Sequence, residues 1–214
     1  MSSLTVQDQR AGVWWRPDRP EWWMGMLFAA GSSCFAVAAI ASQWASASRP
    51  GIGVTYFVGS LFFTSAAVLQ YREAGAADRR ASAIQLIGTL AFNVSTFLAL
   101  QRGLDAHQTN LRVWAPDAVG SVCFLVASEL AYAAVCGRWV CLRVRSLPWW
   151  VAALNMVGSI AFGVSAVTAL IVPSTSEPVS AAVTNAGTAI GALCFLAGGV
   201  LLLPAVARAA PATS

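Results

Sequence analysis

The chain consists of six long, mostly apolar stretches separated by short polar segments. A helix needs about 20 mostly apolar residues to cross a bilayer core, and the lower limit is about 17. The sequence therefore predicts an all-α transmembrane protein, a six-helix bundle with polar tails at 1–21 and 204–214. A soluble helical protein is the alternative, but no stretch has the broad polar face of a water-exposed helix. The stretches are 22–43, 54–70, 82–100, 117–137, 149–172 and 180–203.

The composition also favours a membrane protein. Of the 214 residues, 57% are hydrophobic and only 10% are charged, against about 25% charged in an ordinary soluble domain. These values exclude a secreted disulfide scaffold, a disordered tail protein and a typical cytosolic enzyme. The 13 basic residues are all arginines, and they are spread over the polar segments. We therefore expect no nucleic-acid partner. The expected partners are the lipid bilayer and, beyond it, a second copy of the chain or another membrane protein.

The arginines predict the orientation of the bundle. Three of them, Arg49, Arg102 and Arg112, lie in loops on one side, and ten lie on the side of the two tails. Cytoplasmic segments carry the excess of positive charge. We therefore expect a multi-pass protein of the cell membrane with both termini in the cytoplasm. The ten arginines are Arg10, Arg16, Arg19, Arg72, Arg79, Arg80, Arg138, Arg143, Arg145 and Arg208.

The ends of the predicted spans are consistent with a membrane location. All nine tryptophans lie at or beyond a predicted span end, where an indole with one N–H donor prefers the headgroup region. The first span ends near Ala45-Ser46-Ala47, which resembles a signal-peptide cleavage site. Its apolar region is longer than the about 7–15 residues of a signal, so we expect a retained helix.

Every span contains the same motif, a glycine followed directly by Ser, Thr or Ala and four residues later by Phe. Small residues recur seven and eight positions after the glycine. Because positions 0, +4 and +8 share one stripe of a helix, we expect helices to approach at the glycines, with each Phe beside a neighbour's glycine. The glycines are Gly31, Gly59, Gly88, Gly120, Gly158 and Gly191, and the phenylalanines are Phe35, Phe63, Phe92, Phe124, Phe162 and Phe195.

The sequence leaves the grouping of the six spans into larger repeats open. Spans one to three could match spans four to six as an inverted repeat, which is common in transporters. The Trp22-Trp23 and Trp149-Trp150 pairs instead match span one with span five, because both precede the motif glycine at the same spacing.

These motifs resemble a known family. The Gly-Ser-x-x-Phe spans, the Trp-Trp lead-in and the segment Tyr-Phe-Val-Gly-Ser-Leu-Phe-Phe at 56–63 are similar to the YrhK-like group of small bacterial integral membrane proteins. The similarity extends over most of 13–203. The smallest members of that group hold about two such spans, whereas this chain has six. The resemblance implies an integral membrane protein without an assigned activity, so it carries over no functional residue.

Glu129 is the first candidate binding residue. By the predicted boundaries it is the one ionisable residue well within a span, and a carboxyl in hydrocarbon is costly unless it is protonated, paired or hydrated. It lies nine residues after the glycine of its span and so points away from the motif stripe. A carboxyl bonded to a neighbour or snorkelling to the headgroups is the structural alternative to a proton- or cation-handling role.

Other polar residues inside the spans are the further candidates. Gln85, Asp117 and Asn155 each lie three residues before a motif glycine, which turns them toward the stripe, and Asn93 lies further along the third span. Hydrogen bonds between helices explain such residues without any substrate. A small polar cavity lined by Gln85, Asn93 and Asn155 is the functional alternative.

The sequence contains no pattern of catalytic or metal-binding residues. Three of the five cysteines occupy the position three residues after a motif glycine, where we expect them to pack. Cys136 and Cys141 lie at the cytoplasmic end of span four, where thiols stay reduced and where no His or second Cys pair completes a zinc site. His107 is the one histidine and lies in a loop. We therefore expect no enzyme activity, no cofactor and no metal.

Two classes of function follow from these features. A structural or accessory membrane component fits the absence of catalytic motifs and the even packing stripes. A small-solute or ion transporter that uses Glu129 and the polar residues of the stripes is the alternative.

Reporter fusions will test the predicted topology. We expect both termini and the 71–81 and 138–148 loops to report the cytoplasm, because they carry most of the arginines. A fusion in the 102–116 loop that reports the cytoplasm as well would contradict the prediction.

Overall fold

In a computed structural model of the protein, the described residues are 15–44, 49–137 and 139–208. Six helices are long and apolar enough to cross a membrane, which confirms the all-α six-helix bundle and makes the chain an integral membrane protein. Most of both tails and the Ala45-Ser46-Ala47 segment lie outside the described residues. The six helices are α2 (Pro20–Ala41), α3 (Arg49–Glu73), α4 (Arg79–Leu98), α6 (Ala115–Cys136), α7 (Leu147–Thr168) and α8 (Ala181–Arg208).

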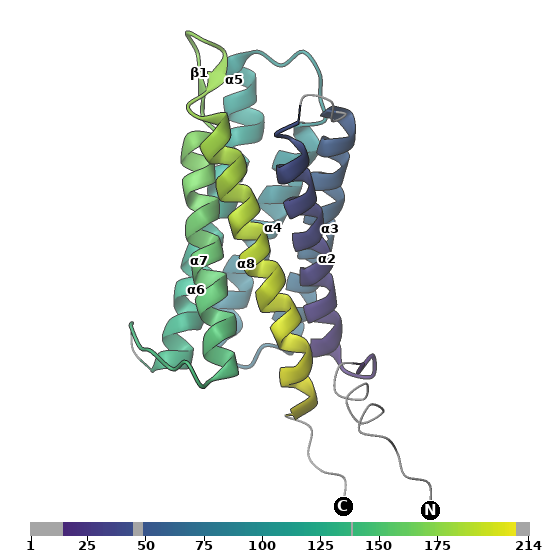
Figure 1. The fold of residues 1–214 in the computed structure, drawn as a ribbon, viewed down its shortest axis with the longest axis vertical. Coiled ribbons are helices and arrows are strands. Elements are labelled where there is room, and N and C mark those ends of the chain that lie inside the picture. Colours follow the sequence, from purple (N-terminus) through teal and green to yellow (C-terminus); the bar gives the residue numbers. More distant parts are fainter. Residues whose placement is uncertain (1–14, 45–48, 138, 209–214) are drawn as a thin grey trace, which may run out of the picture.

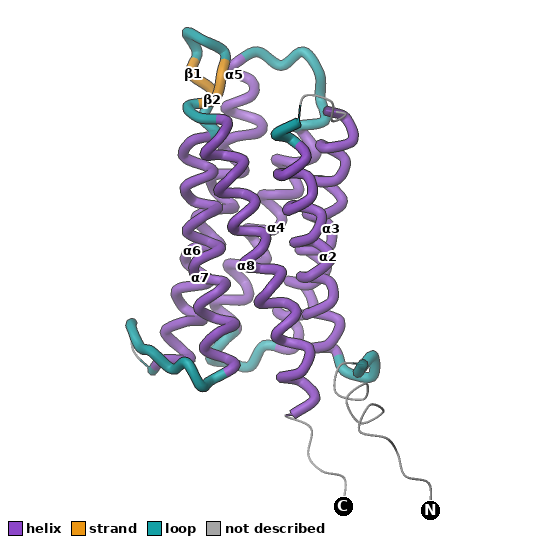
Figure 2. Tube along the Cα trace, in the orientation of Figure 1, coloured by secondary structure: helices purple, strands orange, loops and turns teal. Residues whose placement is uncertain are grey.

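The six helices form a closed ring in chain order. Each packs against the next, and α8 packs against α2 to complete the ring. The start of α2 and the end of α8 lie at one end of the bundle, which we call the proximal end, and the opposite end is the distal end (Figure 1). Figure 2 shows that the short strands β1 (Ile171–Val172) and β2 (Glu177–Pro178) cap the distal end.

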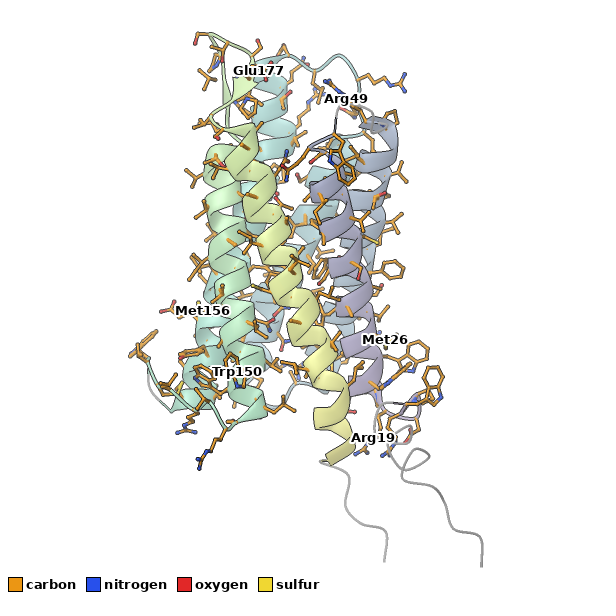
Figure 3. The ribbon with its side chains drawn as sticks, in the orientation of Figure 1. Arg19, Met26, Arg49, Trp150, Met156 and Glu177 are labelled. Atoms are coloured by element: carbon orange, nitrogen blue, oxygen red, sulfur yellow. A yellow bond between two sulfur atoms is a disulfide. The ribbon has the colours of Figure 1, made fainter. Side chains whose placement is uncertain are left out.

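Small residues line the inside of the ring, and large aliphatic residues cover its outside. The buried positions of the helices are mainly Gly, Ala, Ser and Phe, while Val, Ile and Leu dominate the exposed hydrophobic positions. Met26 and Met156 also project from the outer surface (Figure 3). Exposed apolar surface of this extent does not suit contact with water, so the outside of the ring faces lipid.

Glycine pairs set the spacing within three consecutive hairpins, α2–α3, α4–α6 and α7–α8. In each hairpin the two motif glycines face each other, and each also faces the motif Phe of its partner. A Cβ added to Gly59, for example, would lie 2.8 Å from the Phe35 ring. The expected interlocking of glycine and Phe is therefore confirmed, and its unit is the two-helix hairpin.

The ring excludes the inverted repeat of three spans. Viewed from one end, consecutive helices follow one another around the ring in a single sense. A rotation about an axis in the membrane plane turns helices upside down and reverses that sense. A match of spans one to three with spans four to six, in that order, requires the same sense around the ring in both halves. A rotation about an axis in the membrane plane therefore cannot superimpose the two halves. The Trp-Trp match pairs α2 with α7, and each of these two helices is the first of its hairpin.

The fourth span begins earlier than predicted. Asp105 starts a capping box with Gln108, and α5 (Ala106–Thr109) continues through the π-helix η1 (Asn110–Trp114) into α6. The wider π turn lies just before Pro116, which has no N–H and clashes with a regular preceding turn. Trp114 and Asp117 therefore lie inside this span. The predictions that every tryptophan marks a span end and that Glu129 is the only ionisable residue well inside a span were wrong.

Cys136 and Cys141 form a disulfide, which contradicts the prediction of reduced thiols. Gly137 ends α6 with a φ of 67°, so the chain turns back and brings the two Cα atoms within 5.5 Å. The bridge is buried under Trp149, whose indole N–H donates to the carbonyl of Cys141 at 3.1 Å. This burial limits the access of other thiols, on which reduction depends.

Substitution of Gly191 will test the glycine contacts. A Cβ at Gly191 would lie 2.9 Å from the carbonyl oxygen of Gly158, and backbone cannot move aside like a flexible side chain. We expect Gly191→Ala to lower the free energy of unfolding by about 1–3 kcal/mol, measured by thermal melting in detergent. Gly163→Ala is the matched control: nothing lies within 4 Å of its added Cβ, so the variant should gain up to about 1 kcal/mol. Equal melting of both variants would contradict the contact.

Thiol counting will test the disulfide. In denaturing detergent without reductant, we expect alkylation of three cysteines, because Cys34, Cys123 and Cys194 are free and the other two are bonded. Prior reduction should raise the count to five, read as an intact-mass shift. Five labelled thiols without reduction would show that the bridge does not form.

Candidate functional site

Six phenylalanines close the centre of the ring. They are the motif residues, one from each helix, and each is 5% exposed or less. Phe63 contacts Phe124 and Phe195 at centroid distances of 6.2 and 6.1 Å, and Phe92 contacts Phe162 at 6.0 Å. These pairs come from helices that are not neighbours in the ring, so the rings meet on the axis. We call this cluster the phenylalanine plug.

The plug consists of two layers of three rings, one layer from α2, α4 and α7 and the other from α3, α6 and α8. Within each hairpin, one ring from each layer meets the other, at 5.4, 5.1 and 5.5 Å between centroids. All these separations fall in the range of favourable aromatic pairs, about 4.5–7 Å. The plug is therefore a packed apolar barrier across the middle of the ring.

A cavity of about 450 Å³ lies on the proximal side of the plug. Phe195 of the plug contributes to its lining, and Gln70, Gln85 and Asn155 supply most of its polar groups. Asp78, the residue before α4, lies at its mouth. We call this cavity the proximal vestibule.

A second cavity, of about 270 Å³, lies on the distal side. Phe35 and Phe162 of the plug contribute to its lining. Its polar groups include the side chains of Tyr56, Asp117 and Asn185 and several hydroxyls. We call this cavity the distal vestibule. The two vestibules and the plug thus lie in line along the ring axis.

One motif position lines both vestibules, the residue three before each motif glycine. In α2, α4 and α7 this residue faces the proximal vestibule, and in α3, α6 and α8 it faces the distal vestibule, because alternate helices run in opposite directions. The proximal set is Phe28, Gln85 and Asn155, and the distal set is Tyr56, Asp117 and Thr188.

The structure brings together two of the four predicted site residues. Gln85 and Asn155 both line the proximal vestibule. Asn93 instead lies between α3 and α4, where its amide donates to the Thr64 hydroxyl at 2.8 Å. Glu129 is exposed on the outside of α6 and lines neither vestibule. The predicted direction of Glu129 was correct, but the cavity shared by Gln85, Asn93 and Asn155 does not form.

Asp117 also lines a vestibule, although it is not among the predicted site residues. It shares the motif position of Gln85 and Asn155, and that position is the signal that could have selected it. Tyr56 and Thr188 occupy the same motif position in α3 and α8, but their residue types alone do not mark them as site candidates.

Two hydroxyl pairs join neighbouring hairpins. Ser60 pairs with Thr96 at 3.0 Å, and Ser128 pairs with Ser159 at 2.8 Å. In both pairs, one hydroxyl belongs to the residue directly after a motif glycine, and the other belongs to the residue eight positions after the motif glycine of the neighbouring helix. In the described part of the chain, two buried hydroxyls have no partner, because the positions opposite them are Gly199 and Ala166. These are Ser32 and Ser121.

Within the described residues, no group of three or more His, Cys, Asp or Glu side chains could hold a metal ion. Comparisons with known protein families, with curated proteins and with solved structures find no match to this chain. The likeness to YrhK-like proteins therefore rests on the sequence motifs alone.

Proposed function

We propose that this protein is a pathway for a small polar solute across the membrane, with the phenylalanine plug as its gate. The observation that carries the proposal is the alignment of two polar vestibules on the ring axis, one on each side of an apolar barrier. Narrow hydrophobic constrictions are known to close pores by excluding water. A bundle that served only as a scaffold would gain nothing from polar cavities in its interior.

The cavity volumes support a small solute. The proximal vestibule, at about 450 Å³, lies at the lower end of the usual range for ligand pockets, about 300–1,000 Å³. The distal vestibule is smaller, about 270 Å³, equal to roughly nine water molecules at about 30 Å³ each. A solute that occupies both in turn is therefore no larger than about nine water molecules.

A structural or accessory role is the second candidate. It is favoured by the plug itself, because the six rings belong to one buried hydrophobic cluster across the ring. On this view the vestibules are packing gaps and the plug never opens. The two candidates differ in one measurable quantity, the flux of small solutes.

The repeat and the orientation belong to the same proposal. We propose that the ring arose by threefold repetition of one hairpin, the size of the smallest YrhK-like proteins. The positive-inside rule supports a proximal end in the cytoplasm of a cell-membrane protein. The buried disulfide at that end is compatible with this orientation only as long as it is sheltered from cytosolic thiols.

A swelling assay in proteoliposomes will test the gate. Phe162→Ala removes one ring that contacts Phe35, Phe92 and Phe195 in the plug. We expect the variant to pass urea, glycerol or methylammonium severalfold faster than the wild type, because loss of the ring opens a gap in the apolar barrier. The rate of light-scattering change after an osmotic step measures this flux.

Phe97→Ala is the matched control, because Phe97 is 55% exposed on the outside of α4. It should leave the flux unchanged. Since loss of a buried Phe costs about 3–5 kcal/mol, the milder Phe162→Leu is measured in parallel and both variants are checked by gel filtration. Folded Phe162 variants with no more flux than empty liposomes would refute the pathway and favour the structural role.

A further inference from the structure

We propose that the distal vestibule is a binding site for a small organic cation, a short alkylammonium, with the Asp117 carboxylate as its counter-charge. The inference rests on the proposed pathway, because it names the class of solute that enters from the distal end. Three features of the cavity carry it: an unpaired acid, a lining without basic residues, and aromatic rings around the acid.

The first feature is that Asp117 has no hydrogen-bond or ion-pair partner among the described residues. Within the described residues it makes no hydrogen bond and no ion pair, and the salt bridge found there joins Arg16 to Asp18 outside the ring. A carboxyl in a membrane interior is costly unless it is paired, hydrated or protonated. The half-buried side chain of Asp117 opens into the vestibule, so a ligand is the available partner.

The second feature is the sign of the charge along the axis. Asp117 and Asp78 are the charged side chains that line the two vestibules, and among the described residues no arginine lines either one. In a cavity of low dielectric constant, acids without nearby cations attract positive charge. An anionic solute is therefore disfavoured at both ends of the plug.

The third feature distinguishes an organic cation from a metal ion. Phe35, Tyr56, Trp114 and Phe162 all line the vestibule, and aromatic faces bind alkylammonium groups through cation–π attraction. The Trp114 ring is held in place, because its N–H donates to the carbonyl of Ala166 at 2.8 Å. Ca²⁺ takes six to eight oxygen ligands, usually with several carboxylates, and no group of three or more His, Cys, Asp or Glu among the described residues could hold a metal ion.

The uncharged acceptors complete the site. The Asn185 side chain lines the cavity and makes no hydrogen bond within the described chain. The Thr188 hydroxyl, in contrast, is already bonded to Ser165 at 2.7 Å. An ammonium group has three N–H donors, which Asp117 and Asn185 can accept together. The cavity of about 270 Å³ limits the attached alkyl chain to a few carbons.

Tryptophan fluorescence of the full chain in detergent will test the site. Trp114 is the tryptophan that lines a vestibule, so Trp114→Phe gives the background of the other indoles. The probes are propylammonium chloride and its neutral counterpart propanol. The titration is run at about pH 8.5, where an alkylamine with a pKa of about 10.4 remains charged.

We expect saturable quenching of Trp114 by propylammonium and none by propanol. Asp117→Asn keeps the shape but removes the charge, so it should weaken binding at least about tenfold, equal to about 1.4 kcal/mol. Glu129→Gln is the matched control, because it removes an acid from the outer face and should not change binding. No saturable quenching in the wild type, or equal binding by Asp117→Asn, would overturn the cation site.

The two proposals can fail separately. The fluorescence titration needs no flux, so binding without any solute flux would leave the cation site and remove the pathway. Flux through Phe162→Ala without propylammonium binding would leave the pathway and remove the cation site.

Discussion

The architecture depends on the contact between facing glycines inside each hairpin. Without a side chain at these positions, two antiparallel helices come close enough for each motif Phe to lie over its partner's glycine. In lipid, burial of apolar area does not drive helices together, so close packing at small residues is what holds them. The same contact turns all six phenylalanines toward the axis. The plug and the two vestibules on either side of it are therefore consequences of the glycine pairs.

Much of this arrangement could be predicted from the sequence, because the motif recurs six times with a fixed spacing. The apolar stretches identified the helices, the motif glycines identified the contact stripe, and the +4 position identified the residue that packs beside each glycine. The position three residues before each glycine also turned out to be informative. It marked Gln85 and Asn155, which line the proximal vestibule.

What could not be predicted depends on contacts between segments far apart in sequence. Periodicity shows which face of a helix is buried but not which helix covers it, so the closed ring and the exclusion of an inverted repeat needed the structure. The start of the fourth span was missed because Asn110, Arg112 and Pro116 look like a loop. A π turn carries the helix past the proline. The structure therefore places Asp117 in a cavity inside the ring, whereas the prediction placed it at the first residue of the span.

The three hairpins differ in chemistry at equivalent positions. The motif glycines and phenylalanines are the same in all three hairpins, and they make a frame with an apolar barrier at its centre. The residue three before the glycine is free to vary, and it does: on the distal side the three hairpins carry a phenol, a carboxylate and a hydroxyl. Packing alone would favour one residue at all three places, as it does for the Phe. A carboxylate at one of three equivalent positions makes the ring electrically asymmetric, which is the property that a site for a single small cation requires.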